Sequence, residues 1–357
     1  MDGERYSRQT QLKDFGPEAQ AKLAAAKVLV VGAGGLGVPV LTYLNAMGVG
    51  TLGIVEEDEV SLSNLHRQVL YSADEVGHAK LDVAIKKLKA QNPDTQLIPY
   101  YEFLTLENAL SIIEGYDLVI DATDNFPTRY LINDACVILK KPFVYGALHS
   151  FEGQVSVFNY KNGPTYRCLF PKMPSAKEVP NCNAHGVLGV IPGIVGNLQA
   201  LEAVKVLTGI GEVLSGKLLL FNGLEQTFQK INFGANPSNL KITSLQETYG
   251  LSCSVNSDTI ESKDFEKLLS IDNIQIIDVR TVGEFEEFHL KNSINLPLED
   301  IEDWKHTLGY DQPVYVLCHS GSRSLEALAI LVAYKNESDI INVNGGIEQL
   351  KKYAVKY

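Results

Sequence analysis

The run VLVVGAGGLG, residues 28–37, constrains the fold more than any other feature, because an apolar strand-like segment ends there in a glycine-rich turn. Further apolar runs, TLGIVE, LVIDA and FVYG, follow up to about residue 145. Helix-length segments such as Val38–Met47 and Ala79–Gln91 separate them. Strands that alternate with helices are typical of a parallel sheet with helices on both faces. We therefore predict a doubly wound α/β core of the nucleotide-binding type.

The rest of the chain is predicted to complete this domain and to add a second one. Residues 151–231 contain a strand pair, GQVSVFNY and GPTYRC, a helix-like stretch and a closing strand, KLLLFNG. The composition then turns polar and loses its periodicity, which is typical of a linker. We predict a first domain at residues 1–245, a linker at 246–256, and a small second α/β domain at 257–357, whose roughly 100 residues are a common domain size.

Composition argues against several classes of protein. A formal charge of −12 disfavours nucleic acid as a partner, because nucleic-acid-binding faces carry a basic excess. The amino terminus is charged and lacks the apolar core of a signal peptide, and no later apolar run is expected to span a bilayer. We therefore expect a cytoplasmic protein. The five cysteines form no CxxC pair, which predicts neither a disulfide framework nor a zinc knuckle.

The glycine-rich turn predicts phosphate binding. Gly32, Gly34 and Gly37 form G-x-G-x-x-G between a strand and a helix, a pattern that presents backbone N–H groups to phosphate at a helix N-terminus. Glu56 follows the next strand, where an acidic side chain usually binds ribose hydroxyls. These features alone fit an NAD-dependent oxidoreductase equally well, so that alternative stays open.

Two cations further on favour a triphosphate over NAD. Arg67 follows Ser63 and Asn64 in SNLHRQ, and Lys80 opens a helix-like segment. Fixed positive charges near a mononucleotide suit ATP, whose negative charge grows on the leaving pyrophosphate.

A predicted strand end adds a candidate metal ligand to this site. The strand YDLVI leads into DATDN, which places Asp121, Asp124 and Asn125 at the edge of the sheet where open α/β folds bind ligands. A carboxylate such as Asp124 can hold Mg²⁺ against phosphates there. Each residue alone could be a helix cap or a surface charge, but the whole set favours ATP with Mg²⁺.

Taken in order, these motifs resemble the MoeB/ThiF family of adenylating enzymes, relatives of the ubiquitin-activating enzymes. RYSRQ, GAGGLG, SNLHRQ, Lys80, DATDN and NCNAHGVLGVIPGIVG match over about residues 4–230. SNLxRQ together with TDN is far more specific than the glycine motif. The resemblance implies a Rossmann-like sheet of the ThiF/MoeB type and ATP-dependent adenylation of the C-terminal glycine of a small ubiquitin-like sulfur carrier similar to MoaD or ThiS.

The resemblance also implies roles for individual residues. Gly35 is expected to lie against the nucleotide and Glu56 to bind the ribose. Asp124, with Asn125, is expected to complete the Mg²⁺ and adenylate site. Arg8, in RYSRQ, is expected to reach the phosphates from a second subunit, which implies a homodimer. The residues expected to hold the phosphates are Ser63, Asn64, Leu65, His66, Arg67 and Lys80.

The sequence departs from the family pattern at two places. Glu56 stands where the family usually has Asp, but the carboxylate that accepts the hydroxyls is kept. The family often binds structural zinc through two CxxC pairs, whereas TYRC has Thr165 in place of the first cysteine and no CxxC follows. We therefore expect no zinc and an ordinary half-buried thiol at Cys168.

A second cysteine lies in a loop that could make it reactive. Cys182, in VPNCNAHGVLG, precedes an apolar helix-like stretch, a setting that can expose a thiol and lower its pKa. By position it matches the loop cysteine that in some family members attacks the adenylate or joins sulfur transfer. An incidental buried cysteine is the alternative, and the nearby His185 is more simply structural.

The second domain carries a cysteine at a strand end. In PVYVLCHSGSRS, Cys318 begins a loop of small residues that leads through Arg323 into a helix-like segment. Loop amides and a helix N-terminus make a pocket for an anionic sulfur. Cys318 and Arg323 have four residues between them, one fewer than in cysteine phosphatases, so the loop suits a persulfide better than a phosphate ester.

This segment resembles the rhodanese family. IIDVR, with Asp278 and Arg280, EFEEFHLKNSINLP and NVNGGI occur in matching order over about residues 256–357. The resemblance implies that Cys318 accepts sulfane sulfur from a donor such as a cysteine desulfurase. The persulfide then passes sulfur to the adenylated carrier, giving a thiocarboxylate and AMP.

Other functions stay open at this stage. One is a sulfur-relay protein whose ATP domain only senses nucleotide, and another is the NAD-dependent oxidoreductase. A third keeps adenylation but acts on a tRNA base or a small peptide carboxylate. The sequence does not distinguish a carrier for molybdopterin, thiamine, cysteine or tRNA thiolation.

Overall fold

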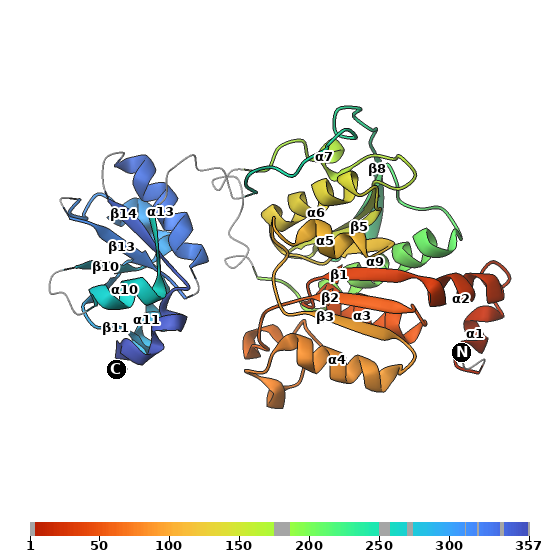
Figure 1. Cartoon of the computed structure of the whole chain (residues 1–357), viewed down its shortest axis with the longest axis horizontal. Coiled ribbons are helices and arrows are strands. Elements are labelled where there is room, and N and C mark those ends of the chain that lie inside the picture. Colours follow the sequence, from red (N-terminus) through yellow and green to blue (C-terminus); the bar gives the residue numbers. More distant parts are fainter. Residues whose placement is uncertain are drawn as a thin grey trace. The chain divides into compact units, whose positions relative to one another are not determined.

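The computed structural model describes residues 4–174, 186–249, 258–269, 274–310, 312–319, 321–335 and 339–355. The chain divides into two compact units, residues 1–251 and 252–357 (Figure 1). Each unit has its own sheet and its own apolar core.

The larger unit is built on an eight-stranded sheet of order β3-β2-β1-β4-β5-β6-β7-β8. The strands from β3 to β5 pair in parallel, and β6, β7 and β8 extend the sheet in antiparallel fashion. Because β2 and β4 flank β1, their carboxyl ends form a switch point of the kind that binds ligands. The strands are β1 (Lys27–Val31), β2 (Thr51–Val55), β3 (Gln96–Tyr100), β4 (Leu118–Asp121), β5 (Phe143–His149), β6 (Glu152–Phe158), β7 (Lys217–Asn222) and β8 (Thr227–Asn232).

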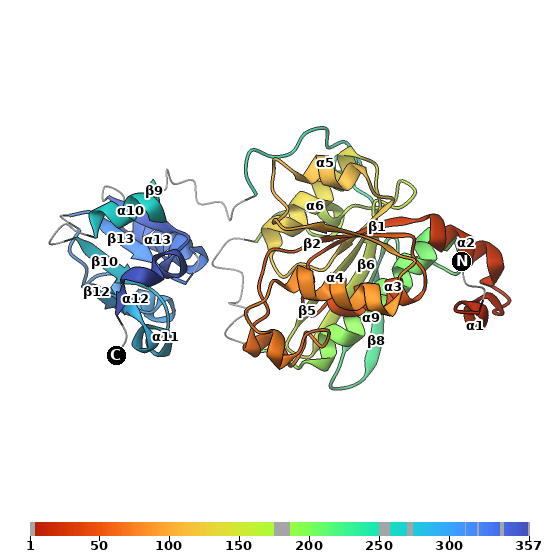
Figure 2. The same ribbon diagram turned by 60° about the horizontal axis from the view of Figure 1, so that its bottom comes forward.

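Helices cover both faces of this sheet (Figures 1 and 2). Val28 and Val30 of β1 belong to a core shared with α2, α3, α4 and α9, whereas Leu29 and Val31 belong to a core shared with α5 and α6. A strand buried on both sides in this way requires a continuous apolar sequence, as KVLVV provides. The predicted Rossmann-like, doubly wound fold is confirmed. The helices are α1 (Ser7–Thr10), α2 (Gly16–Ala25), α3 (Gly37–Ala46), α4 (Lys80–Gln91), α5 (Ala109–Glu114), α6 (Phe126–Ile138), α7 (Tyr166–Leu169) and α9 (Val190–Thr208).

Two local predictions in the second half of this unit need correction. GPTYRC was predicted as a strand, but Tyr166–Leu169 form the short helix α7, which the capping box of Thr165 with Cys168 begins. Strand β8 was not predicted, because each of its residues is exposed and no alternating apolar pattern marks it.

Helix α9 has an unusual composition for a surface helix. It is the one described helix that is long and apolar enough to cross a membrane, so the expectation that no such run exists does not hold by length and composition. Half of this apolar stretch is buried within the unit. Its residues Ile191, Val195, Ala203 and Val204 belong to the core. The all-round apolar character of α9 therefore matches its packing between α3 and the sheet.

Residues that were predicted to start the linker are held by the larger unit. The Tyr249 hydroxyl donates to Asp134 Oδ2 at 2.6 Å, and Arg167 donates two bonds of 2.7 Å to the same carboxylate. Tyr249 is buried. Tyr249, within the predicted linker, thus packs as part of the larger unit.

The smaller unit has a five-stranded parallel sheet of order β12-β10-β13-β14-β9. Two apolar cores lie against it, one around Ile277 and Val316 and the other around Ile276 and Leu317. The central strand β13 ends where the candidate cysteine loop begins. The elements are β9 (Asp258–Glu261), α10 (Ser262–Leu268), β10 (Gln275–Asp278), α11 (Val282–Glu287), β11 (His289–Leu290), β12 (Ser293–Asn295), η3 (Leu298–Asp300), α12 (Ile301–Trp304), β13 (Val314–Leu317), α13 (Ser322–Tyr334), β14 (Ile340–Asn344), η4 (Ile347–Tyr353) and β15 (Ala354–Val355).

Candidate functional site

The glycine turn after β1 is shaped by two close backbone approaches. Gly32 has a φ of +98°, and a Cβ at this position would lie 2.8 Å from the Ala122 carbonyl oxygen. A Cβ on Gly37 would lie 1.9 Å from the Gly32 carbonyl oxygen. Neither position can therefore carry a side chain, because Gly32 lies against the segment after β4 and Gly37 lies against Gly32 itself. The turn leaves the amino end of α3 facing the carboxyl edge of the sheet, as phosphate binding requires.

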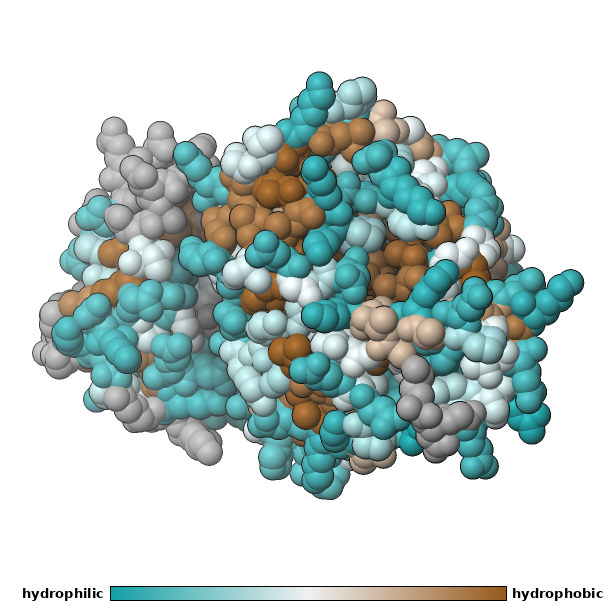
Figure 3. All heavy atoms as spheres, turned by 45° about the vertical axis from the view of Figure 1, so that its right-hand side comes forward, coloured by the Kyte–Doolittle hydropathy of each residue, from teal (hydrophilic) through white to brown (hydrophobic). Residues whose placement is uncertain are grey.

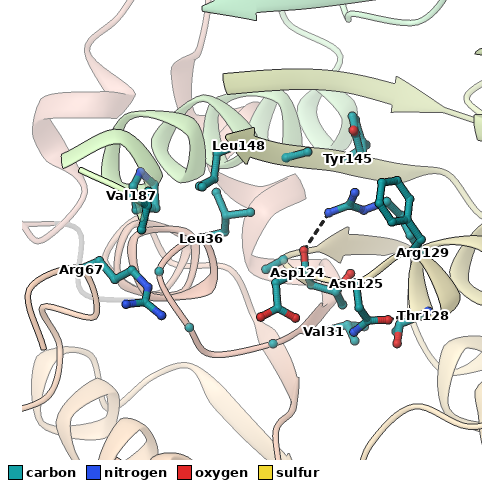
Figure 4. Close-up of a pocket in the computed structure, with 18 of the residues that line it drawn as sticks. Val31, Leu36, Arg67, Asp124, Asn125, Thr128, Arg129, Tyr145, Leu148 and Val187 are labelled. Carbon is teal, nitrogen blue, oxygen red and sulfur yellow. Dashed lines mark hydrogen bonds between the residues drawn. The ribbon is translucent and has the colours of Figure 1, made fainter. Parts of the chain in front are cut away.

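A pocket of about 760 Å³ opens at this edge. In Figure 4, Arg67 and Asp124 approach the glycine turn from different elements and point into the same space. The pocket is large enough for a nucleotide together with an extended peptide tail. The predicted nucleotide-site residues that line it are Gly32, Gly34, Gly35, Glu56, Asn64, Arg67, Lys80, Asp124 and Asn125.

Glu56 is buried and braces the glycine turn. Its carboxylate accepts hydrogen bonds from the backbone N–H of Ala33 and of Asp58, each at 2.9 Å. Burial raises the pKa of Glu56, and the nearby Lys80 lowers it in part. Both carboxylate oxygens retain a lone pair for a ribose hydroxyl, so bracing the turn and binding ribose are compatible.

Lys80 is enclosed between two carboxylates. Its Nζ lies 2.7 Å from Asp58 Oδ2 and 3.8 Å from Glu56 Oε2, and only 4% of its side chain is exposed. Lys80 is the first residue of α4, and its N–H donates to the Asp58 carbonyl oxygen. The ammonium group is thus held in one place without freedom to reorient. Asp58, which sequence reasoning missed, lines the pocket and is more than half exposed.

Arg67 is oriented by its own motif. Its guanidinium donates to Asn64 Oδ1 at 2.7 Å and to the Ser63 carbonyl oxygen at 3.4 Å. Three predicted phosphate ligands of the motif, Ser63, Leu65 and His66, do not line the pocket. Ser63 and His66 are exposed, and Leu65 packs against the apolar cluster of Val38, Val60, Tyr71, Val83 and Ala84.

The DATDN segment contains two aspartates in different environments, Asp121 buried and Asp124 exposed. Asp121 is fully buried, accepts from Thr123 N–H and Oγ1, and lies 3.4 Å from Arg129 Nε. Burial raises the pKa of Asp121, and Arg129 opposes this rise. Asn125 caps α6 by accepting the Thr128 N–H at 2.9 Å. Asp124 is exposed, so its carboxylate is the one free to bind a cation in the pocket.

Arg129 is a pocket residue that sequence reasoning missed. It is 6% exposed, and its guanidinium donates to the Thr123 carbonyl oxygen at 3.0 Å, the bond drawn in Figure 4. It also lies over the rings of Phe126 and Tyr145, at 5.5 and 5.2 Å. The only sequence signal was its place one turn into the helix after DATDN.

Arg8 lies far from the pocket of its own chain. Helix α1 is fixed at the carboxyl end of α3, because Gln9 donates to the Met47 carbonyl oxygen at 3.0 Å and Asn92 donates to the Tyr6 hydroxyl at 2.9 Å. The glycine turn is at the other end of α3, which has ten residues and spans about 15 Å. Arg8 is exposed there.

Thr165 and Cys168, and likewise Asn236 and Asn239, have the spacing of a CxxC pair, but only Cys168 carries a thiol. Thr165 Oγ1 lies 3.4 Å from Cys168 Sγ, the Asn236 N–H donates to it at 3.2 Å, and Asn239 Nδ2 lies at 3.9 Å. Burial raises the pKa of Cys168, but these hydrogen bonds together outweigh it and lower the pKa. A hydroxyl and two amides in place of thiolates do not fit a zinc ion. Among the described residues, no group of three or more His, Cys, Asp or Glu side chains could hold a metal.

Two predicted residues cannot be placed. Cys182 and His185 lie outside the residues that the structure describes.

In the smaller unit, Cys318 lies in an anion-binding loop. It follows β13 directly, is buried, and accepts the Gly321 N–H at 3.1 Å; the Ser324 hydroxyl lies 3.6 Å from its sulfur. Helix α13 begins at Ser322, so its amino end faces the same sulfur. These groups favour an anionic sulfur without any side-chain cation.

Arg323, predicted to be catalytic, is engaged by an acidic partner. Its guanidinium donates to both oxygens of Glu284, at 2.7 and 2.6 Å. Arg280, in the IIDVR motif that carries the rhodanese resemblance, is 1% exposed and pairs with Asp278 at 2.7 Å. Arg280 also donates to the Phe288 carbonyl oxygen at 2.7 Å, which braces the turn after β10.

The fold and these sites define a nucleotide-binding domain of the Rossmann type followed by a domain with a buried cysteine in an anion-binding loop. The model of the ThiF family matches residues 6–242, and that of the Rhodanese-like domain matches residues 261–353. The chain belongs to the ThiF family and carries a C-terminal rhodanese-like domain, which confirms both resemblances seen in the sequence.

Similar curated proteins share one or both domains. The Sulfur carrier protein adenylyltransferase of Thermus thermophilus is 56% identical over 239 residues, covering 66% of this chain and 88% of the relative. The Adenylyltransferase and sulfurtransferase MOCS3 of Drosophila yakuba is 40% identical, covering 90% of this chain and 76% of the relative. The MOCS3 protein of Xenopus laevis is 38% identical over 96% of this chain and 85% of its own length.

Among solved structures, E. coli MccB has the same fold. Its complex with MccA-N7isoASN aligns with a TM-score of 0.60 at 21% identity, covering 68% of this chain and 75% of that chain. Its complex with ATP aligns with a TM-score of 0.56 at 23% identity, covering 65% of this chain and 72% of that chain.

Proposed function

We propose that this protein uses ATP to adenylate the C-terminal glycine carboxylate of a small ubiquitin-like sulfur carrier and then supplies sulfur from Cys318. The observation that carries the proposal is one pocket that brings together the glycine turn, Arg67, Lys80 and Asp124, in a chain that also holds Cys318 in an anion-binding loop. The names of the relatives from Thermus and Drosophila agree with these two activities.

The first step needs charge and alignment more than acid–base chemistry. The carrier carboxylate is already ionised at neutral pH, so it attacks the α-phosphorus directly and pyrophosphate leaves. Arg67 and Lys80 are placed to balance the charge that builds up on the pyrophosphate. Because Lys80 is fixed by Asp58 and Glu56, little reorganisation is needed as that charge grows.

Mg²⁺ fits this pocket through Asp124. Mg²⁺ is usually bound by one or two carboxylates together with phosphates and water, and Asp124 is exposed to the pocket while Asp121 is buried. When bound, the ion offsets phosphate charge. Asn125 uses its side-chain oxygen to cap α6, so we assign it to positioning Asp124 instead of to the ion.

The second step transfers sulfur. The terminal sulfur of a Cys318 persulfide attacks the adenylated carboxyl carbon, and AMP leaves from a carrier that is then joined to Cys318 through an acyl disulfide. A second thiol cleaves this disulfide, releasing the carrier thiocarboxylate and forming a new disulfide with Cys318. Cys182 stays our candidate for that thiol, and a cysteine desulfurase persulfide stays our candidate for the sulfur source.

We further propose a cytoplasmic homodimer in which Arg8 enters the partner's pocket. This is supported by the place of Arg8 at the opposite end of α3 from its own pocket, and by exposed apolar side chains such as Leu12, Leu62, Val69 and Leu201. Figure 3 shows apolar patches among hydrophilic ones on the visible surface. Mixing Arg8→Ala with Asp124→Ala chains should restore about a quarter of wild-type adenylation through mixed dimers, whereas no recovery would contradict the exchange of Arg8.

The proposed adenylation is tested by ATP–pyrophosphate exchange with Mg²⁺ and purified carriers of the MoaD and ThiS types, each compared with a version lacking its last glycine. Exchange that requires the intact tail supports the proposal and identifies the carrier. ATP binding without exchange by any carrier would favour a sulfur-relay protein that only senses nucleotide.

A further inference from the structure

Two side chains of the described Cys318 loop, Arg323 and His319, face acidic groups from other elements. Arg323 makes its bidentate pair with Glu284 of α11, and His319 Nε2 lies 3.4 Å from Glu348 Oε2 of η4. Backbone bonds from Ile347 and Glu348 to the carbonyl oxygens of Cys318 and His319 hold η4 against the loop. Arg323, the arginine of this loop, is therefore paired with a carboxylate, and a second carboxylate lies beside His319.

The sulfur itself does not depend on Arg323. The Gly321 N–H at 3.1 Å, the Ser324 hydroxyl at 3.6 Å and the amino end of α13 already surround Cys318 Sγ. These partial charges suit one negative charge on a thiolate or persulfide. A donor that brings two negative charges is bound better where a cation is free to pair with the second charge. Arg323, in the same loop as Cys318, is such a cation, but Glu284 holds it.

Glu284 is held firmly as a carboxylate. The hydrogen bonds from Arg323 are the main reason that its pKa falls to about 2. Thr281 adds an N–H bond of 3.1 Å and a hydroxyl bond of 2.9 Å to Glu284 Oε2, forming the capping box of α11. The capping box thus fixes the Glu284 carboxylate at the start of α11, where it binds Arg323.

We propose that Glu284 is a specificity-determining positioning residue that, by neutralising Arg323, makes the domain prefer a donor with a singly charged persulfide over dianionic thiosulfate. This inference rests on the proposed sulfurtransferase function. It names a persulfide, such as one on a cysteine of another protein, as the chemical class of the donor.

Both donors allow the same balanced transfer. The Cys318 thiolate attacks the outer sulfur of the donor, a new S–S bond forms on Cys318, and the donor S–S bond breaks. The leaving group is a thiolate from a persulfide and sulfite from thiosulfate. Neither transfer needs an external oxidant or reductant. The two donors therefore differ in the charge that they bring to the Cys318 loop.

The test uses the full chain and measures Cys318 persulfide formation by intact mass, with cysteine persulfide and with thiosulfate as donors. Glu284→Gln keeps an oxygen for the Thr281 capping box, which accepts Gln as well as Glu, but removes the charge. Arg323 is then free, and the ratio of kcat/KM for thiosulfate to that for cysteine persulfide should rise about tenfold. Glu284→Gln combined with Arg323→Gln should return the ratio to the wild-type value, and Glu286→Gln, an exposed acid on the same helix, should leave it unchanged.

Three results would overturn the proposal. If Glu284→Gln slows both donors in the same proportion, Glu284 only supports the loop. If the wild-type protein is active and the ratio does not move, the charge of Glu284 does not select the donor. If wild-type Cys318 forms no persulfide with either donor, the sulfurtransferase function fails and this inference fails with it.

Discussion

The two sites of this protein bind negative charge at the carboxyl ends of parallel strands, but they do so with different groups. The nucleotide pocket adds buried and oriented side-chain cations, Lys80 and Arg67, to its glycine turn. The Cys318 loop relies on a backbone N–H, a hydroxyl and a helix end, and its Arg323 is neutralised. The difference matches the chemistry: a triphosphate carries several charges and releases pyrophosphate, whereas a thiolate carries one.

The largest effects are expected when each site is inactivated alone, because each variant should lose one activity and keep the other. Asp124→Ala should lower pyrophosphate exchange by about 10³-fold, because the carboxylate proposed to bind Mg²⁺ is lost, and should leave persulfide formation on Cys318 intact. Cys318→Ala should do the reverse. Loss of both activities in either variant would mean that the two units do not act as separate sites.

The next largest effect is expected from the enclosed lysine. Lys80→Met should lower exchange about 100-fold and also destabilise the larger unit by ~3 kcal/mol, since Glu56 is left buried without its cation. Thermal unfolding and exchange are measured on the same sample. Lys86→Met, an exposed lysine of the same helix, is the matched control. Adding Glu56→Gln to Lys80→Met should restore part of the stability, because the unpaired buried charge is then gone, and failure to do so would contradict charge as the cause.

A smaller effect should distinguish the two hydrogen-bonded thiols. Cys168 accepts an N–H much as Cys318 does, but at a site that joins α7 to the loop around Asn236. Cys168→Ser should lower the free energy of unfolding by about 1 kcal/mol while both activities persist.

Metal analysis should find no stoichiometric zinc in the wild type, whereas Thr165→Cys, Asn236→Cys and Asn239→Cys together should create a zinc site. Zinc in the wild-type protein would contradict the hydrogen-bonded arrangement.

The smallest expected effect concerns pH. Arg323 lowers the pKa of Glu284 from 4.5 to about 2, so the pair stabilises the fold above the unfolded-state pKa and this contribution is lost as the pH falls through about 2. The ratio of rates with thiosulfate and cysteine persulfide should therefore show no step from Glu284 between about pH 5 and pH 8. A step in that range that disappears in Glu284→Gln would show that the pair is weaker than the structure indicates.

The features that could be predicted from the sequence are those that short, continuous segments of the chain encode. The glycine turn, Glu56, Lys80 and DATDN each follow an apolar strand or open a helix, so their place at one sheet edge followed from parallel topology. The rhodanese-like loop was equally local, since Cys318 and Arg323 lie within one short segment.

The remaining features depend on contacts between distant segments. In the sequence, Asp58 is one acid in a run of four, and its role appears only when Lys80 is found against it. Glu284 pairs with Arg323, which lies 39 residues further on, and no local sequence pattern predicts this pair. GPTYRC has the composition of a strand, but the capping of α7 by Thr165 with Cys168 decides its structure.

The most direct test of the whole account is to follow the mass of a carrier with an intact glycine tail in the presence of ATP, Mg²⁺, a persulfide donor and a thiol. The wild-type protein should convert the tail to a thiocarboxylate, Cys318→Ala should stop at the adenylate, and Asp124→Ala should leave the carrier unchanged. Thiocarboxylate formed at the wild-type rate by Cys318→Ala, or formed without ATP, would contradict the succession of the two sites.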